Sequence, residues 1–138
     1  MKQLFTSLLI IAAVSFAPAS FAGDKVSPVT IDGATTVSAA EAKALFDKGV
    51  LFLDVRKDKD WNAGRVPDAI HIDQKKKLNE GSMSAKVKKD QEVVIYCNGP
   101  KCMRSSRASK MAVGWGFKKV HYFRDGFPGW KSAGYPVE

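Results

Sequence analysis

Cysteine and histidine are scarce in this sequence, with two residues of each among 138. The four residues are Cys97, Cys102, His71 and His121, and their spacing does not resemble the closely spaced ligand pairs of a structural zinc site. Both histidines fall inside predicted strands, where we expect them to be packed or hydrogen-bonded. The sequence therefore predicts no metal site and no cofactor.

Long apolar runs are absent after the first residues. The one such run, Leu4–Phe16, follows a basic start and breaks at Pro18, so it is shorter than the roughly 18 apolar residues of a membrane span. Small residues then precede a cleavage point between Ala22 and Gly23, a pattern typical of a secretory signal peptide. We expect residues 1–22 to be removed, the mature protein to make no stable membrane insertion, and its location to be periplasmic.

Removal of this leader would leave 116 of the 138 residues, which is the size of one domain. The remainder contains no internal repeat and no linker that would divide it. We expect an extended lead-in at residues 23–34 and one domain over residues 35–138. Because the periplasm is oxidising, a disulfide between the two cysteines has to be considered.

Acidic residues are fewer than basic ones, at 14 against 22, and the net charge is +8. Much of the excess lies in Lys75–Lys77 and in the lysines near residue 88. No basic stretch is interleaved with aromatic residues that could stack on bases, so we expect no nucleic-acid partner. We interpret the lysine-rich segment as a solvated surface whose positive field speeds the arrival of a small anionic substrate.

Apolar strand patterns alternate with helix patterns along the chain. Ser38 and Glu41 form the sequence signature of a capping box, which begins a short helix that Gly49 ends. Strands are predicted over residues 50–55, 69–72, 92–96 and 119–123, and helices over 57–65, 105–113 and 127–133, with one loose helix and loops over 74–90. This alternation predicts an α/β domain with a mainly parallel sheet.

Cys97 directly follows the predicted strand 92–96. Ligands of parallel α/β sheets bind outside the carboxyl ends of the strands, so this cysteine stands where chemistry is expected. The following loop leads to a helix that begins near Ser105, and backbone N–H groups and the helix dipole would favour an anion there. With Lys101 and Arg104 nearby, we expect the Cys97 thiol to ionise readily and to be a nucleophile.

Four segments resemble the rhodanese (sulfurtransferase) family, and together they cover nearly all of the expected mature chain. They are LFLDVRKDKDWNAGRVPDAIHI, VVIYCNGPKCMRSS, GWGFKKVHYFRDGFPGW and AGYPVE. The resemblance implies a rhodanese-like α/β fold, a five-stranded, mainly parallel sheet flanked by helices. Arg65 and Asp68 stand where the family usually has histidine and glycine, a change in a structural motif that leaves the fold prediction intact.

The resemblance also implies a sulfur transfer by double displacement. A small anionic sulfane donor such as thiosulfate would give its outer sulfur to Cys97, and the persulfide would pass it to a thiol or to cyanide. By the same resemblance, Asp54 and Arg56 tie strand ends and loops together, and Phe127 lies beside the active loop. The expected substrate-binding residues are Asn98, Gly99, Lys101, Cys102, Met103 and Arg104.

The loop allows two alignments with the common family pattern, in which arginine comes five positions after the cysteine. Arg104 lies seven positions after Cys97, whereas Arg107 lies five positions after Cys102. The distance to Gly116 separates them, because it is 19 positions from Cys97, two more than is typical, but only 14 from Cys102. The shorter distance would remove almost a turn of helix, so we predict Cys97 as the catalytic cysteine, in a loop lengthened by two residues.

The role of Cys102 stays open at this level. It could be a resolving thiol that attacks a Cys97 persulfide or closes a disulfide with Cys97, or an incidental buried thiol. Two other functions also remain: a binding module that has lost activity through the longer loop, and a thiol–disulfide redox protein with a redox protein partner. The sequence does not identify the physiological donor, the acceptor or the oligomeric state.

Overall fold

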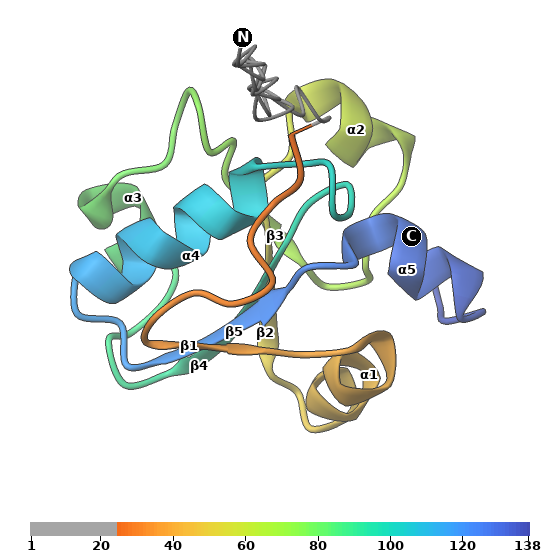
Figure 1. The fold of residues 1–138 in the computed structure, drawn as a ribbon, viewed down its shortest axis with the longest axis horizontal. Helices are drawn as coiled ribbons and strands as arrows, with labels where there is room; N and C mark the ends of the chain where they lie inside the picture. Colours follow the sequence, from red (N-terminus) through yellow and green to blue (C-terminus); the bar gives the residue numbers. More distant parts are fainter. Residues whose placement is uncertain (1–24) are drawn as a thin grey trace, which may run out of the picture.

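The structure, a computed structural model, describes residues 25–138, and the predicted leader at residues 1–22 lies outside the described residues. One five-stranded sheet runs through this part of the chain in the order β1-β5-β4-β2-β3, and all four strand pairings are parallel (Figure 1). The predicted α/β class and the five-stranded sheet are therefore confirmed. The strands are β1 (Ala34–Thr36), β2 (Leu51–Asp54), β3 (Ile70–His71), β4 (Glu92–Tyr96) and β5 (Lys119–Phe123).

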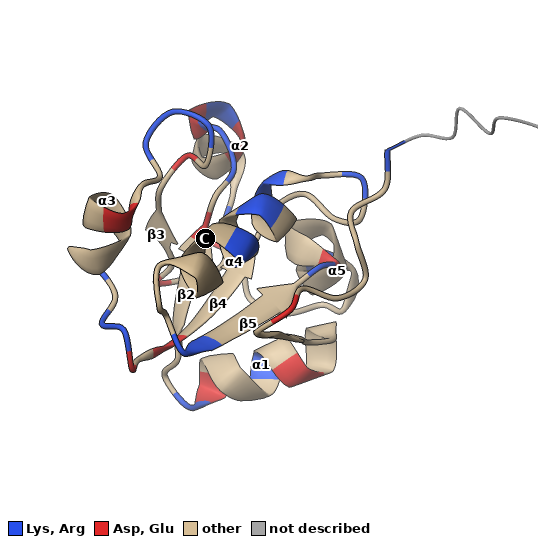
Figure 2. Cartoon of the chain, turned by 60° about the vertical axis from the view of Figure 1, so that its left-hand side comes forward, with Lys and Arg blue, Asp and Glu red and all other residues tan. Residues whose placement is uncertain are grey.

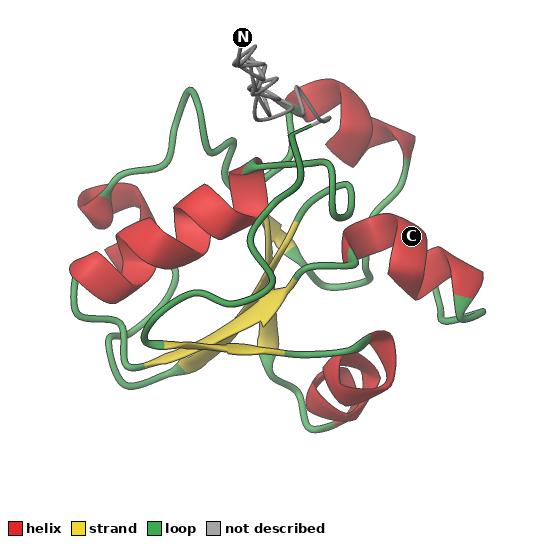
Figure 3. Ribbon diagram, viewed as in Figure 1, coloured by secondary structure: helices red, strands yellow, loops and turns green. Residues whose placement is uncertain are grey.

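Helices cover both faces of the sheet (Figure 3). On one face lie α1 (Ala39–Asp47) and α5 (Gly126–Ser132), and on the other lie α3 (Glu80–Ser84) and α4 (Arg104–Gly114). The short helix α2 (Asp58–Ala63) follows β2. None of the helices within residues 25–138 is long and apolar enough to cross a membrane.

The central strands are buried on both faces, as their continuous apolar sequences predict. Leu53 and Ile95 point into the core beneath α3 and α4, whereas Phe52, Val94 and Tyr96 point into the core beneath α1 and α5. Because successive side chains of a strand alternate between faces, an uninterrupted apolar run is what a sheet covered on both sides requires.

The first helix confirms the capping prediction. The Ser38 side chain accepts the backbone N–H of Glu41 at 3.1 Å, and the Glu41 carboxylate accepts the N–H of Ser38 at 3.1 Å. Gly49 follows the helix with φ +80°, a conformation that glycine adopts without strain. This short-range chemistry places α1 before β2 independently of the rest of the fold.

One segment differs from the sequence prediction, and the least defined one agrees with it. The edge strand β1 begins at Ala34, inside the segment predicted only as an extended lead-in, because its three residues carry little apolar pattern and are fixed by pairing with β5. Residues 74–90 form the five-residue helix α3 between turns, in agreement with the predicted helix and loops. A second capping box, between Asn79 and Ser82, starts α3 at that point.

Candidate active site

The loop between β4 and α4 brings the two cysteines together at the carboxyl edge of the sheet. Cys97 follows the last residue of β4, as predicted, and α4 begins at Arg104. The backbone N–H of Cys102 donates to the carbonyl oxygen of Gly99 at 2.9 Å, and this turn folds the loop back over Cys97. Gly99 has φ +101°, so the turn requires a backbone conformation that favours glycine.

Cys97 lies at the floor of this loop with a fully buried side chain. Its Sγ donates to Ser105 Oγ at 3.1 Å and accepts the backbone N–H of Ser105 at 3.3 Å. Burial is the main cause that raises the pKa of Cys97, and the neighbouring Cys102 adds to it. The direction is opposite to the sequence expectation, because loss of solvent outweighs the hydrogen bonds with Ser105.

Cys102 lies above Cys97 and is only half-buried. A hydrogen bond from the Cys97 side chain, together with the backbone N–H groups of Asn98 and Arg104, lowers the pKa of Cys102 to about 6 against the opposing effect of burial. Of the two thiols, the more accessible Cys102 therefore ionises more readily. Both cysteines are free thiols in this structure.

Arg104 stands at the start of α4 and is anchored by a carboxylate. Its Nη1 donates to Asp73 Oδ1 at 2.6 Å, and the Asp73 side chain is buried. Sequence reasoning assigned Arg104 to the substrate but missed Asp73. The available signal was an acidic residue just after a predicted strand, near the carboxyl edge of the sheet where Asp54 ends β2.

Asp54 and Arg56 hold the loop from the side of β2, which agrees with their predicted structural role. Arg56 binds both carboxylate oxygens of Asp54 at 2.7–3.0 Å, and both side chains are almost fully buried. The same guanidinium donates to the carbonyl of Gly64 at 2.6 Å and to Asn98 Oδ1 at 3.3 Å. Asn98 Nδ2 in turn donates to Asp60 at 2.8 Å, so its backbone N–H is fixed beside Cys102.

The start of α5 packs against the first residues of the loop. The backbone N–H of Phe127 donates to the carbonyl oxygen of Cys97 at 2.9 Å, and its ring lies 4.6 Å from the Arg56 guanidinium. Gly126 has φ +60°, and a Cβ there would collide with that same carbonyl oxygen. The expectation that Phe127 lies beside the active loop is confirmed.

The lead-in crosses over the sheet to reach the tip of the loop (Figure 1). The buried Ser27 donates its backbone N–H and its hydroxyl to the carbonyl oxygen of Pro100, at 2.7 and 2.8 Å. Arg124 Nη2 donates to the carbonyl oxygen of Ser27 at 2.9 Å. A segment without apolar periodicity gave no sequence signal for this contact, although it fixes the lengthened loop.

Positive charge gathers around this edge of the sheet. Figure 2 shows lysine and arginine in the loop before α4 and at the beginning of that helix. Lys101 is exposed in the turn, and Met103 is half-buried at the residue before α4. The segment Lys75–Lys77 begins two residues after Asp73, the partner of Arg104, so the lysine-rich segment lies close to the loop.

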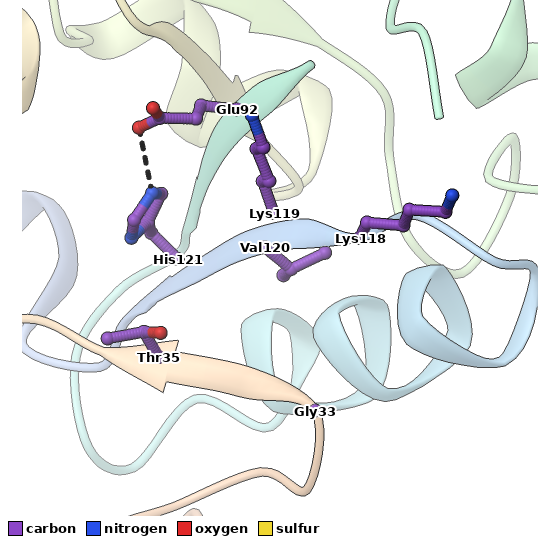
Figure 4. A pocket seen from close by; sticks show the side chains of 7 residues that line it. All are labelled: Gly33, Thr35, Glu92, Lys118, Lys119, Val120 and His121. Atoms are coloured by element: carbon purple, nitrogen blue, oxygen red, sulfur yellow. Dashed lines mark hydrogen bonds and ion pairs between the residues drawn. The ribbon is translucent and has the colours of Figure 1, made fainter. Parts of the chain in front are cut away.

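A separate hollow of about 250 Å³ lies at the opposite, amino edge of the sheet (Figure 4). There His121 Nε2 lies 3.1 Å from a carboxylate oxygen of Glu92. The other histidine, His71, contacts the carbonyl oxygen of Arg56 at 2.7 Å, so both histidines are hydrogen-bonded in strands as expected. The hollow is lined by Gly33, Thr35, Glu92, Lys118, Lys119, Val120 and His121.

The fold and the loop define a parallel α/β domain that presents a pair of cysteines at the start of a helix. The Rhodanese-like domain family matches residues 38–133, and the chain belongs to this family. Asp68, at the position where the family usually has glycine, keeps a left-handed backbone with φ +60°. Arg65, at the usual histidine, lies 4.5 Å from the ring of Trp61 and pairs with Glu138, so both departures are accommodated locally.

Three known proteins illustrate the similarity, at 25–31% identity over the aligned residues. It is 31% identical to thiosulfate sulfurtransferase GlpE of Pseudomonas savastanoi pv. phaseolicola, over 71% of this chain and 87% of GlpE. It is 27% identical to Protein HIGH ARSENIC CONTENT 1 of Arabidopsis thaliana, over 83% of this chain and 72% of that protein. The crystal structure of the BH2092 protein of Bacillus halodurans superposes with a TM-score of 0.68 at 25% identity, covering 76% of this chain and 77% of that one.

Proposed function

We propose that this protein is a sulfurtransferase that moves a sulfane sulfur from a small anionic donor such as thiosulfate to a thiophilic acceptor, a thiol or cyanide. The sulfur is carried between the two substrates as a persulfide on Cys97. The single observation that carries the proposal is the Cys97 sulfur held at the start of α4 by the backbone N–H of Ser105, with Cys102 beside it. The similarity to an enzyme named thiosulfate sulfurtransferase supports the same substrate class.

The surroundings of Cys97 suit an anionic intermediate. The N–H and hydroxyl groups of Ser105 already contact its sulfur, and α4 directs the positive end of its dipole at the loop. Donors fixed before the reaction stabilise developing negative charge without reorganisation. A covalent intermediate also divides one difficult transfer into two easier displacements.

A steady-state assay with thiosulfate and cyanide tests the proposal when it is combined with intact-mass spectrometry. The wild-type protein should turn over and gain one sulfur atom, about 32 Da, after donor alone. Cys97→Ser should abolish turnover, whereas His121→Gln, at the amino edge of the sheet, should leave it unchanged. A folded wild-type protein that neither turns over nor gains sulfur from any sulfane donor would sink the idea.

We also propose that the protein acts after export, in the periplasm. The support is the signal-peptide pattern of residues 1–22, together with a lead-in whose Ser27 is already part of the folded domain. Cell fractionation followed by intact-mass measurement should give a periplasmic protein that begins at Gly23. Recovery of the full-length chain from the cytoplasm would contradict the proposal.

A further inference from the structure

The proposed persulfide site has a problem of access. The Cys97 side chain is fully buried, and it packs in the same core cluster as Leu53 and Val55 of the β2 end. The carbonyl oxygen of Cys102 lies 3.5 Å from Cys97 Sγ, and Cys102 itself packs against that cluster. A dianion such as thiosulfate would have to lose its water and displace the loop before its outer sulfur could meet Cys97.

Cys102 has the properties that Cys97 lacks. It is partly exposed on the loop, and the backbone N–H groups of Asn98 and Arg104 are among the causes that lower the pKa of its thiol. The carbonyl oxygen of Cys102 lies 3.5 Å from Cys97 Sγ, so the two cysteines are already neighbours. A thiolate stabilised in this way is the reactive form of cysteine at neutral pH.

We propose that Cys102 is the entry nucleophile, which takes the sulfane sulfur from an anionic donor and passes it inward to Cys97. This relay rests on the sulfurtransferase function proposed above. It gives the second cysteine of the loop a catalytic role, and it explains why a partly exposed thiol lies beside a buried one.

The first step forms one S–S bond and breaks another. The Cys102 thiolate attacks the outer sulfur of thiosulfate, the bond between that sulfur and the sulfonate breaks, and sulfite leaves with the electron pair. Cys102 then carries an anionic persulfide, and no oxidant or reductant is consumed.

The second step moves the sulfur without a change in redox state. The Cys97 thiol gives its proton to the Cys102 side as its sulfur attacks the outer sulfur of the Cys102 persulfide. A Cys97 persulfide and a Cys102 thiol result. The Ser105 N–H and hydroxyl groups that contact Cys97 then face the new anion, and the acceptor finally takes the outer sulfur.

Two single-cysteine variants separate this relay from direct loading. After brief exposure to thiosulfate, Cys97→Ser should gain one sulfur atom on Cys102 and fail to turn over. Cys102→Ser should load Cys97 at least tenfold more slowly than the wild type does. Ser106→Ala is a matched control with wild-type loading, because the Ser106 hydroxyl donates to the carbonyl of Met103 at 2.9 Å and not to a cysteine.

The outcomes distinguish the relay from the function on which it rests. Wild-type loading of Cys97 that is unaffected by Cys102→Ser overturns the relay alone, as does a Cys97→Ser protein that gains no sulfur. A wild-type protein that instead loses about 2 Da and releases sulfide has closed a disulfide, which also overturns the relay. Failure of the wild type to gain sulfur from any donor overturns the proposed function and the relay with it.

Alkylation of the wild-type protein tests the same assignment without sulfur transfer. Trypsin cleaves after Lys101, so the two cysteines fall on separate peptides, Asp90–Lys101 and Cys102–Arg104. Brief iodoacetamide treatment should label Cys102 with a midpoint near pH 6, the pKa that its neighbours impose. The titratable or charged groups recorded against this sulfur are Cys97, at the end of β4, and Arg104, on α4.

Removal of the Cys97 thiol should change the pH profile of Cys102 alkylation. In Cys97→Ala the Cys102 midpoint should move upward, towards that of an ordinary thiol, because the largest stabilising hydrogen bond is lost. A merely structural role for Cys97 would leave the midpoint where it was. Faster labelling of Cys97 than of Cys102 in the wild type would contradict the assignment.

Discussion

The two edges of the sheet are built very differently, although the same strands form both. At the carboxyl edge, buried charged groups tie the loop to its neighbours: Arg56 binds Asp54, and Arg104 binds Asp73. At the amino edge, an open hollow carries the partly exposed pair of His121 and Glu92. The buried ion pairs therefore lie at the edge where they hold the loop in one conformation. We propose that the reaction takes place at this edge.

The difference between the two edges predicts that the largest loss of stability will come from breaking the contacts of Arg56. Arg56→Met leaves the buried carboxylate of Asp54 without its partner, which should reduce the free energy of unfolding by about 3–5 kcal/mol. His121→Gln, at the amino edge, should change it by less than about 1 kcal/mol, because partly exposed pairs contribute little. Urea denaturation measures both, and equal losses at the two edges would remove the distinction between them.

Breaking the Asp73–Arg104 pair should cause the next largest loss of stability, and this loss should depend on pH in the acid range. Burial alone would raise the pKa of Asp73, but the hydrogen bond from Arg104 and the N–H groups of Lys75 and Lys76 lower it below the ordinary 3.8. A carboxylate with a lowered pKa stabilises the fold above its unfolded pKa, and this stabilisation is lost as pH falls through the folded value.

Asp73→Asn should therefore be less stable than the wild type at neutral pH, by about 1–3 kcal/mol. The difference should shrink as pH falls below about 4, where the wild type loses the same interaction. Asp47→Asn, which breaks an exposed pair with Lys43 on α1, is the control and should follow the wild-type curve. Unfolding followed from pH 7 to pH 3 tests this, and a gap that is constant across that range would contradict it.

Two neighbouring serines at the start of α4 allow a second comparison, within the site. Ser105 contacts the Cys97 sulfur, whereas the equally buried Ser106 caps the carbonyl of Met103. Ser105→Ala should slow sulfur transfer by about tenfold, equivalent to about 1.4 kcal/mol in the barrier. Single-turnover kinetics should show no such loss for Ser106→Ala, and equal losses would mean that helix stability, not the sulfur contact, matters.

The smallest change in stability and in sulfur loading is expected from a substitution in the lead-in. Ser27→Ala removes one hydroxyl bond to Pro100 but leaves the backbone bond, so it should reduce stability by about 1 kcal/mol and slow sulfur loading modestly. Thr36→Val removes a similar bond, from Thr36 to the carbonyl of Val29 at 2.8 Å, away from the loop. Thr36→Val should therefore leave loading unchanged, and parallel behaviour of the two variants would show that the lead-in does not act on the loop.

The sequence was most informative where local chemistry decides the structure. The capping box at Ser38 and the apolar runs of β2 and β4 are short-range signals, and the structure follows them. The edge strand β1 and the contact of Ser27 with Pro100 depend on pairing between distant segments, so no local pattern marks them. Sequence spacing also placed Cys97 at the carboxyl edge of the sheet.

The electrostatics of the site could not be obtained in the same way. Helix dipole and basic neighbours predicted a lowered pKa for Cys97, but burial depends on how the loop closes above it. The turn from Gly99 to Cys102 leaves the Cys102 thiol partly exposed. The N–H groups of Asn98 and Arg104 lower the pKa of Cys102 and not that of Cys97. Which cysteine ionises is therefore a property of the folded loop.

The order in which the two cysteines acquire sulfur tests the central claim most directly. Wild-type protein is mixed with thiosulfate, quenched with an alkylating agent after increasing times, and cleaved with trypsin into the Cys97 and Cys102 peptides. The relay predicts that the added sulfur appears first on Cys102–Arg104 and then passes to Asp90–Lys101. Sulfur that reaches the Cys97 peptide first, with none passing through Cys102, would contradict it.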